Sequence, residues 1–336
     1  MKTQTKVRLT VAAAAGAILW RALARRRQWS GFDGRVVLIT GGSRGLGLVL
    51  AREFVKRGAL VAICARDASE LELARADLEA RGGQVFARIC DVTDAAQASE
   101  LVAAVEEHWG RLDVLVNNAG IIQVGAVDDQ TLDDYKRAMD VHFWAPLHTI
   151  RAALPGMRRR GGGRVVNVAS IGGKIGVPHL LPYDASKFAL VGLSEGLRAE
   201  LARDRIWVTT VCPGLMRTGS PPNALFKGQH KREYAWFSIG GSLPVASMSA
   251  ERAARQIIGA CRRGDAEVIL GLPFKAAARL HGLFPGTTAA VMGLINRLLP
   301  RPGGPIARRG RDSESAATSL LVTPWARAAE RRNNER

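Results

Sequence analysis

Tyr183 and Lys187 lie four residues apart, and Ser170 lies thirteen residues before the tyrosine. On a helix, residues at the first spacing share one face, so a phenol and an ammonium group would lie one turn apart. A nearby ammonium favours the phenolate and lowers the tyrosine pKa toward a range in which it can transfer a proton. A serine hydroxyl from another element could orient a carbonyl oxygen beside them. The three residues predict a proton-transfer site for a carbonyl/alcohol couple, although helices also contain this spacing by chance.

A glycine-rich turn early in the chain is the second chemical feature. The apolar run at 36–39 leads into Thr-Gly-Gly-Ser-Arg-Gly-Leu-Gly at 40–47, and 46–57 has helical periodicity that ends at Gly58. This order predicts a buried strand, a turn and a helix, whose free N–H groups and positive dipole end attract a pyrophosphate. The Gly-x-x-x-Gly-x-Gly spacing also fits a plain glycine-rich turn. The candidate phosphate-binding residues are Gly41, Ser43, Arg44, Gly45, Leu46 and Gly47.

Short apolar segments alternate with helical segments along the chain. Strands are predicted at 60–64, 84–89, 112–116, 164–168, 206–211 and 267–270, and helices at about 67–81, 94–109, 131–159, 182–203 and 250–263. Repeated units of this kind predict an α/β fold with a doubly wound parallel sheet in a single catalytic domain. Ligands bind at the carboxyl ends of the strands in such sheets. The motifs that follow predicted strands are the glycine turn, Asp91, 117–120, Ser170 and Pro213-Gly214.

Taken in order, these motifs resemble those of the short-chain dehydrogenase/reductase family over residues 33–272. The matching segments are 40–47, Asp91-Val92, Asn117-Asn118-Ala119-Gly120, Ser170, Tyr183-x-x-x-Lys187 and Cys-Pro-Gly-Leu-Met-Arg-Thr at 212–218. The resemblance implies a Rossmann-type domain and hydride transfer to or from a nicotinamide. It implies Tyr183 as the general acid/base, Lys187 as the group that holds the ribose and lowers the tyrosine pKa, and Ser170 as the residue that orients the carbonyl.

The same resemblance implies a set of cofactor contacts beyond the glycine turn. Asn118 would lie near the ribose and Thr218 at the carboxamide of the cofactor. The implied cofactor-binding residues are Asp91, Val92, Asn118, Ala119, Gly120, Tyr183, Lys187, Pro213, Gly214 and Thr218.

One position departs from the family pattern. The family's catalytic tetrad includes an asparagine on the helix after the Asn-Asn-Ala-Gly strand, where it helps to hold a water that relays protons to the lysine; this chain has His142 there. A neutral imidazole also has one donor and one acceptor, so His142 is a candidate fourth catalytic residue. The alternative is a packed helix histidine with no role. No metal site is expected, because His142 and His148 are not at ligand spacing and no Cys/His cluster accompanies them.

Charge at the predicted adenosine end favours NADP(H) over NAD(H). NAD-dependent relatives have an acidic residue at the end of the second strand, which binds the ribose hydroxyls. This chain has Ala65 there, with Arg66 next to it, and Arg44 lies inside the glycine turn. Two guanidinium groups suit a 2′-phosphate, whereas either one alone fits a solvated surface charge. Asp67 is predicted to be the N-cap of the following helix.

The composition limits the partners. The 336 residues carry a net charge of +18, much of it from arginine in the termini, and the four cysteines are isolated and indicate reduced core thiols. The sequence contains no basic patch interleaved with aromatic residues and no DNA-binding motif, so nucleic acid is not an expected partner. An anionic membrane surface is the expected partner for the basic charge. A homo-oligomer, dimer or tetramer, is also expected.

Residues 1–30 form a basic and apolar N-terminal segment. The apolar run Leu9 to Trp20 has basic residues on both sides and is shorter than a spanning helix requires. It fits a membrane anchor or interfacial helix, a cleaved signal or a disordered tail. If it spans, the arginine cluster that follows it would keep the catalytic domain in the cytoplasm.

The remaining chain divides into three parts. Residues 31–272 are the predicted catalytic domain, 273–300 an apolar helical extension and 301–336 a disordered basic tail. The extension could pack on the domain, on a dimer mate or on a membrane.

The long segment after Pro213 is rich in aromatic and apolar residues and, in the family, closes over the substrate. It favours a lipophilic ketone or aldehyde, reduced to an alcohol. Two alternatives remain open at this stage: a soluble 3-oxoacyl-thioester reductase, and a non-catalytic NADPH-binding sensor or scaffold.

Overall fold

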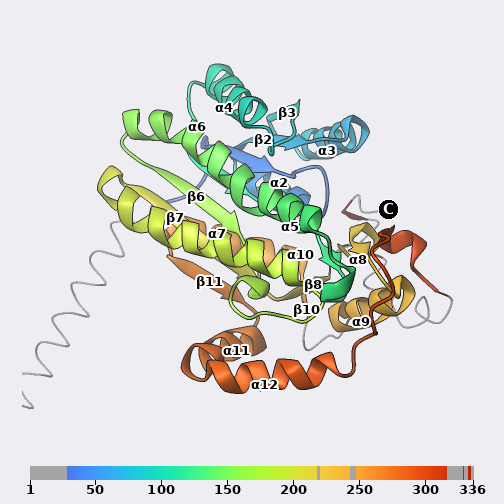
Figure 1. Cartoon of the computed structure of the whole chain (residues 1–336). Coiled ribbons are helices and arrows are strands. Elements are labelled where there is room, and N and C mark those ends of the chain that lie inside the picture. Colours follow the sequence, from blue (N-terminus) through green and yellow to red (C-terminus); the bar gives the residue numbers. More distant parts are fainter. Residues whose placement is uncertain (1–28, 218–219, 243–246, 316–327, 329–331, 334–336) are drawn as a thin grey trace, which may run out of the picture.

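The computed structural model describes residues 29–217, 220–242, 247–315, 328, 332 and 333. Its centre is a seven-stranded sheet in the order β3-β2-β1-β4-β6-β7-β11, in which every neighbouring pair is parallel (Figure 1). This is the doubly wound Rossmann arrangement, so the predicted fold class is confirmed. The strands are β1 (Val36–Thr40), β2 (Leu60–Ala65), β3 (Val85–Ile89), β4 (Val114–Asn117), β6 (Gly163–Val168), β7 (Ile206–Pro213) and β11 (Glu267–Leu270).

Helices cover both faces of the sheet, because successive strand residues point to opposite sides. In β1, Val37 and Ile39 join one buried apolar cluster, and Val36 and Leu38 join the other. The first cluster is covered by α2 (Gly45–Val55), α3 (Ala68–Ala80) and α10 (Ala250–Arg263). The second is covered by α4 (Ala95–Trp109), α6 (Ala145–Arg159) and α7 (Leu181–Glu200) (Figure 1).

Side-chain caps fix where two of these helices begin. The carboxylate of Asp67 accepts a hydrogen bond from Glu70 N at the start of α3, and that of Asp94 accepts bonds from Ala96 N and Gln97 N at the start of α4. Each cap satisfies N–H groups that have no partner inside the helix. The predicted N-cap role of Asp67 is therefore confirmed.

The helical stretch predicted over about 131–159 is present, and it contains one irregular turn. It consists of α5 (Leu132–Met139), a π-helical turn (Asp140–Trp144) and α6. The predicted helical stretch is confirmed, and the π-helical turn lies where Pro146 has no N–H to donate to the carbonyl of His142, four residues earlier. Such π-helical turns often occur at functional sites. This one carries His142, which is 1% exposed.

The segment after β7 folds into short elements. These are β8 (Leu215–Arg217), α8 (Ser220–Asn223), β9 (Leu225–Phe226), α9 (His230–Ser242) and β10 (Ser247–Ser249). β10 pairs with β8, and β9 pairs with β5 (Gln123–Val124), which follows β4 in the chain. A buried ion pair between Lys227 and Asp134 ties this segment to α5.

Residues 301–315 are ordered, so the prediction of a disordered tail from 301 onward was wrong for this stretch. β12 (Arg308–Arg309) pairs antiparallel with β9. The Asp129 carboxylate accepts hydrogen bonds from Gly303 N at 3.0 Å and Gly304 N at 2.6 Å. These contacts use backbone groups, a strand edge and one carboxylate, none of which requires the apolar periodicity that the sequence lacks here.

The predicted helical extension is present as a pair of helices, α11 (Leu272–Leu283) and α12 (Pro285–Asn296), beside the main body (Figure 1). Neither contains a buried residue, and Leu283 and Leu294 are 72% and 61% exposed. Most of the large apolar side chains of the pair are therefore exposed within the described part of the chain.

Among the described residues, no helix is long and apolar enough to cross a membrane. The predicted N-terminal segment lies outside the described residues as far as residue 28.

Candidate active site

The carboxyl ends of the central strands bring most of the predicted site residues to one edge of the sheet. The glycine turn follows β1, Asn118 follows β4, Ser170 follows β6 and Gly214 follows β7. Tyr183 and Lys187 lie near the start of α7, which packs against β7 and against the turn after Ser170. Thr218 lies outside the described residues.

Two positions of the glycine turn have no room for a side chain. Gly41 has a φ of +64°, and a Cβ on it would lie 2.9 Å from the Ala119 Cα. A Cβ on Gly47 would overlap the Gly41 carbonyl oxygen. These two glycines therefore let the turn pack closely on itself and on Ala119 before the N-terminus of α2, and a helix N-terminus suits the pyrophosphate of a dinucleotide.

The backbone carbonyl oxygen of Asn333 contacts the N-terminus of α2. Gly45 N donates a hydrogen bond to the backbone carbonyl of Asn333 at 2.9 Å. Arg52, on α2, donates to the Asn333 side-chain oxygen and to the Arg332 carbonyl, each at 3.0 Å. No sequence pattern indicates this contact, because it depends on where Arg332 and Asn333 lie in space. It shows that the Gly45 N–H is available to an acceptor oxygen.

Thr40 and Asn118 tie the turn to the end of β4. The Thr40 hydroxyl oxygen accepts from Asn118 N at 3.0 Å and from Ala119 N at 3.1 Å. The Asn118 amide donates to the carbonyls of Thr40 and Gly41, each at 3.1 Å. Its side chain therefore supports the glycine turn. Thr40 was not among the predicted site residues, although a hydroxyl directly before the glycines was a visible signal.

Both arginines of the predicted adenosine site have a carboxylate partner. Arg44 pairs with Glu70 at 2.9 Å, and Arg66 lies 3.8 Å from Asp91. Their side chains remain 40% and 68% exposed, so each pair is open to competition from solvent ions. Val92, beside Asp91, is a buried core residue. Glu70 was not among the predicted site residues, because it lies within α3, away from the motifs.

Lys187 is buried and directed at the end of β6. Its Nζ donates to the Val168 carbonyl at 2.9 Å and lies 5.6 Å from the centroid of the Tyr183 ring. The side chain is 4% exposed. Burial lowers the pKa of Lys187 to about 7, because a desolvated ammonium is unfavourable.

The expectation that the tyrosine pKa falls is wrong for Tyr183 in this structure. Burial raises the pKa of Tyr183 to about 12, and a hydrogen bond with Ser170 opposes this rise. With a pKa of about 7, Lys187 carries only part of its charge at neutral pH, so it does not offset the desolvation of the phenol. Burial of both groups was not visible in their spacing. The phenol therefore keeps its proton, next to the serine predicted to orient the carbonyl.

His142 lies against the tyrosine with both ring nitrogens engaged. Its ring is 5.3 Å from the Tyr183 ring, edge to face. Nε2 accepts from Ile121 N at 3.1 Å, and Nδ1 lies 2.8 Å from Ser186 Oγ. Because the Ser186 hydroxyl donates to the Tyr183 carbonyl, it accepts the Nδ1 proton, which fixes the neutral tautomer. Burial and the Lys187 charge hold the His142 pKa well below its ordinary value.

Ser186 was not a predicted site residue. It sits three residues after Tyr183, and a serine at this spacing bonds back to the carbonyl of the preceding turn of its own helix. That local signal was present in the sequence, but its pairing with a histidine from another helix was not.

An apolar cluster adjoins Tyr183. Its buried members include Phe226 and Tyr234, and Tyr183, Trp236 and Phe237 pack against it. The aromatic residues of the segment after Pro213 thus lie beside the predicted proton donor. Gly214 lies against Phe274 in the first turn of α11, and a Cβ on this glycine would overlap the phenylalanine ring.

The family model, the similar sequences and the similar structures agree with one another. The family model described as short chain dehydrogenase matches residues 35–224. A provisionally named ketoacyl reductase of Streptomyces coelicolor is 42% identical over 190 residues, which cover 55% of this chain and 72% of that protein. Dehydrogenase/reductase SDR family member 7B of Bos taurus is 35% identical over 258 residues, which cover 75% of this chain and 78% of that protein. The crystal structure of a short-chain dehydrogenase from Streptomyces avermitilis has a TM-score of 0.68 at 31% identity, and the match covers 79% of this chain and 98% of that one.

Proposed function

The chain belongs to the short-chain dehydrogenase/reductase family, and we propose that it is an NADP(H)-dependent carbonyl reductase with Tyr183 as its proton donor. As a family member it is an NAD(P)-dependent oxidoreductase acting on CH–OH and C=O groups. The observation that carries the proposal is the convergence of Ser170, Tyr183 and Lys187 at the end of β6, beside a glycine turn that fits a dinucleotide.

The protonated phenol suits reduction. The bound nicotinamide would supply a hydride to the carbonyl carbon. Tyr183, with its pKa at about 12, holds a proton that it can give to the carbonyl oxygen. Ser170, hydrogen-bonded to Tyr183, would orient the same oxygen. Lys187 adjoins the phenol and would favour the phenolate left after proton transfer whenever it is charged.

His142 acts in this proposal as a positioning residue. A neutral imidazole has one donor and one acceptor, and both are satisfied, by Ser186 and by Ile121 N. No capacity is left on the ring for a relay water. The histidine would instead fix the helix turn that carries Tyr183, through Ser186 and the Tyr183 carbonyl.

The preference for NADP(H) is supported by Arg44 and Arg66. β2 ends at Ala65, where NAD-dependent relatives have an acidic residue, and Arg66 follows it, so the ribose end is not acidic in their manner. A 2′-phosphate carries more charge than one carboxylate and would compete with Glu70 and Asp91 for the exposed guanidinium groups.

The substrate we propose is a lipophilic ketone or aldehyde. The apolar cluster with Phe226, Tyr234, Trp236 and Phe237 lies against Tyr183 and supports this class. Membrane association would fit such a substrate, and the exposed apolar side chains of α11 and α12 support it. A homo-oligomer through the same helices is the competing use of this face.

A second candidate is the reduction of 3-oxoacyl thioesters. It is favoured by the similarity to the provisionally named ketoacyl reductase of Streptomyces coelicolor. Equal or faster turnover of 3-oxoacyl thioesters than of free lipophilic ketones would select it.

The deciding experiment compares ketones, aldehydes and 3-oxoacyl thioesters with NADPH and with NADH, on the wild type and on Tyr183→Phe. We expect NADPH-dependent turnover of lipophilic carbonyls that Tyr183→Phe abolishes while cofactor binding persists. Unimpaired function of Tyr183→Phe in cells would instead point to a sensor or scaffold. Small polar ketones reduced as fast as lipophilic ones would contradict the proposed substrate class.

A further inference from the structure

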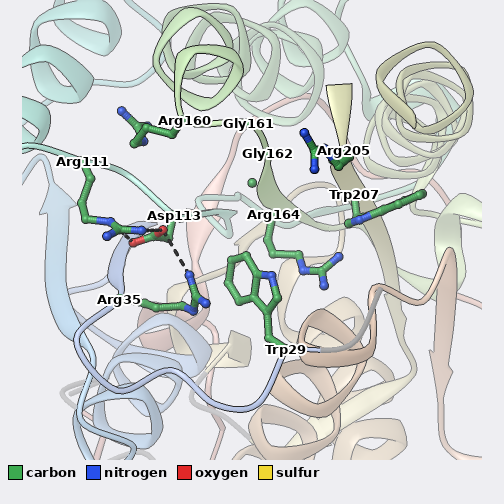
Figure 2. A pocket seen from close by; sticks show the side chains of 11 residues that line it. Trp29, Arg35, Arg111, Asp113, Arg160, Gly161, Gly162, Arg164, Arg205 and Trp207 are labelled. Atoms are coloured by element: carbon green, nitrogen blue, oxygen red, sulfur yellow. Dashed lines mark hydrogen bonds and ion pairs between the residues drawn. The ribbon is translucent and has the colours of Figure 1, made fainter. Parts of the chain in front are cut away.

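A cavity lies at the edge of the sheet opposite the candidate active site. It has a volume of about 390 Å³, within the range of small-molecule sites. Its walls come from the amino ends of four strands: Arg35 precedes β1, Asp113 precedes β4, and Arg164 and Trp207 are the second residues of β6 and β7 (Figure 2). In a parallel sheet these ends are remote from the carboxyl ends that hold the candidate active site.

The charges around this cavity, which we call the arginine pocket, are unbalanced. It is lined by five arginines and one carboxylate, together with a glycine run and two tryptophans. Arg35 and Arg111 share the single carboxylate of Asp113, at 3.4 Å and 2.6 Å (Figure 2). Arg160 likewise shares Glu106 with Arg159. The lining residues are Trp29, Arg35, Arg111, Asp113, Arg160, Gly161, Gly162, Gly163, Arg164, Arg205 and Trp207.

The guanidinium groups extend from the floor of the pocket to its rim. Arg164 is 1% exposed, and its guanidinium carbon lies 4.7 Å from the centroid of the Trp29 ring. Arg205 is exposed, and the Arg111 side chain is 45% exposed. Figure 2 shows Arg111, Arg35 and Asp113 on one side of the opening and Arg205 and Trp207 on the other. An anion entering between them would meet donors at several depths.

The tryptophans favour a phosphate group over a nucleotide base. The Trp29 ring is contacted by Arg35 at 3.9 Å as well as by Arg164, and the Trp207 ring by Arg198 at 5.5 Å. Rings that hold guanidinium groups in place are less available for stacking a base. Arginine forks match the geometry of phosphate oxygens, and glycines at 161–163 allow the backbone to come close.

We propose that the arginine pocket binds a phosphate group of an anionic ligand, at a site separate from the candidate active site. The first described residue, Trp29, forms part of its wall, and in the sequence the apolar run Leu9 to Trp20 ends fewer than ten residues before it. A lipid headgroup at a membrane surface is therefore the source that the chain best explains, and a free phosphorylated compound has the same chemistry.

The test uses the full-length protein, two probes and two charge-matched double variants. Arg111→Gln with Arg205→Gln alters the rim of the pocket. Arg75→Gln with Arg203→Gln removes the same charge from exposed arginines outside it. The first probe is inorganic phosphate at constant ionic strength, with chloride as the reference anion and tryptophan fluorescence as the signal. The second is sedimentation with phosphatidylcholine vesicles, with and without phosphatidylglycerol.

If the pocket binds a lipid headgroup, the wild type should bind the vesicles that contain phosphatidylglycerol, and the pocket variant should bind them about tenfold or more weakly. The control variant should lose much less of its affinity for these vesicles. Inorganic phosphate should then compete with the vesicles. If phosphate changes the fluorescence of the wild type but not of the pocket variant, while both variants bind vesicles alike, the phosphate site is supported and its ligand is a free compound.

The proposal is overturned if phosphate gives no response beyond that of chloride and the two double variants bind vesicles equally. Melting temperature and carbonyl reduction serve as folding controls for both variants. If the pocket double variant is unfolded, Arg205→Gln is compared with Arg203→Gln by the same measurements. Because the pocket lies away from Tyr183, loss of phosphate binding with unchanged reduction also separates this result from failure of the proposed function.

Discussion

The imidazole Nδ1 of His142 lies 2.8 Å from the hydroxyl of Ser186, whose proton goes to the carbonyl of Tyr183. A histidine on one helix is thus bonded to the turn of another helix that carries the proposed proton donor. We expect Ser186→Ala to leave the buried Nδ1–H without its acceptor, which costs about 1–3 kcal/mol of folding stability. Chemical denaturation of the two proteins measures this.

A double-mutant cycle shows whether the bond itself is responsible. His142→Phe with Ser186→Ala removes both partners and should be less destabilising than the sum of the single changes. The single variants should lower kcat more than they raise KM, because they disturb the placement of Tyr183 and not the substrate site. Strict additivity, with kcat unchanged, would show that the pair has no positioning role.

Lys187 predicts the pH profile of the free enzyme. Its pKa of about 7 means that the ammonium charge is lost as pH rises through neutrality, whereas Tyr183 keeps its proton to about pH 12. We expect kcat/KM for reduction to fall as pH rises through about 7, since this parameter reports groups of the free enzyme. Lys187→Arg, which stays charged, should remove that limb at a lower overall rate. Lys174→Arg is the control, and an identical limb in both variants would contradict the assignment.

Asp184 predicts a pH-dependent stability. Burial raises its pKa to about 8; Oδ2 accepts from Val177 N, and Oδ1 is buried without a hydrogen-bond partner among the described residues. Between its ordinary pKa of about 4 and about 8, the folded state keeps a proton that the unfolded state releases, so stability falls as pH rises through this window. Each unit of pKa shift corresponds to about 1.4 kcal/mol.

Asp184→Asn tests this, because the amide stays neutral and can still accept from Val177 N. We expect the variant to gain stability relative to the wild type as pH is raised from 5 toward 8, to an extent of roughly a few kcal/mol. Denaturant midpoints at several pH values measure the difference. Asp133→Asn, at a carboxylate that is 88% exposed, should show no such trend. A constant difference at every pH would mean that the carboxyl does not titrate in this window.

The proposed cofactor preference depends on Arg44 and Arg66. We expect Arg66→Ala to raise the KM for NADPH roughly tenfold and to leave that for NADH nearly unchanged, because the lost contact is a charge-assisted one to the 2′-phosphate. Glu70→Gln should act in the opposite sense, since it frees Arg44 from its 2.9 Å partner. Steady-state kinetics with both cofactors measure these effects, with Arg75→Ala as the control. Equal changes for NADPH and NADH would show that neither arginine reads the phosphate.

The features that could be predicted from the sequence are those that a local pattern of residues determines. The sheet follows from the alternation of apolar runs with helical segments. The glycine turn follows from glycines at positions where a Cβ has no space, as at Gly41 and Gly47. The raised pKa of Tyr183 could not be predicted, because it depends on burial that many separate segments produce. Pairings across long stretches of sequence, such as His142 with Ser186 or Gly303 with Asp129, leave no periodic signal. The contact of Asn333 with the glycine turn could not be predicted for the same reason, because it joins residues far apart in the sequence.

That last contact predicts competition at the cofactor site. The Asn333 carbonyl occupies the Gly45 N–H, which a cofactor pyrophosphate would need, and Arg52 holds the C-terminal residues there through two hydrogen bonds. Truncation after residue 315 keeps β12 and removes Asn333. We expect the truncated protein to have a several-fold lower KM for NADPH at unchanged kcat, because a competing intramolecular acceptor lowers apparent affinity by the fraction of molecules it blocks. Arg52→Gln, in the full-length chain, should change KM in the same direction, whereas Arg332→Ala, which loses an exposed pair with Glu251, should have little effect. If truncation leaves the KM unchanged or raises it, the C-terminal residues do not compete with the cofactor.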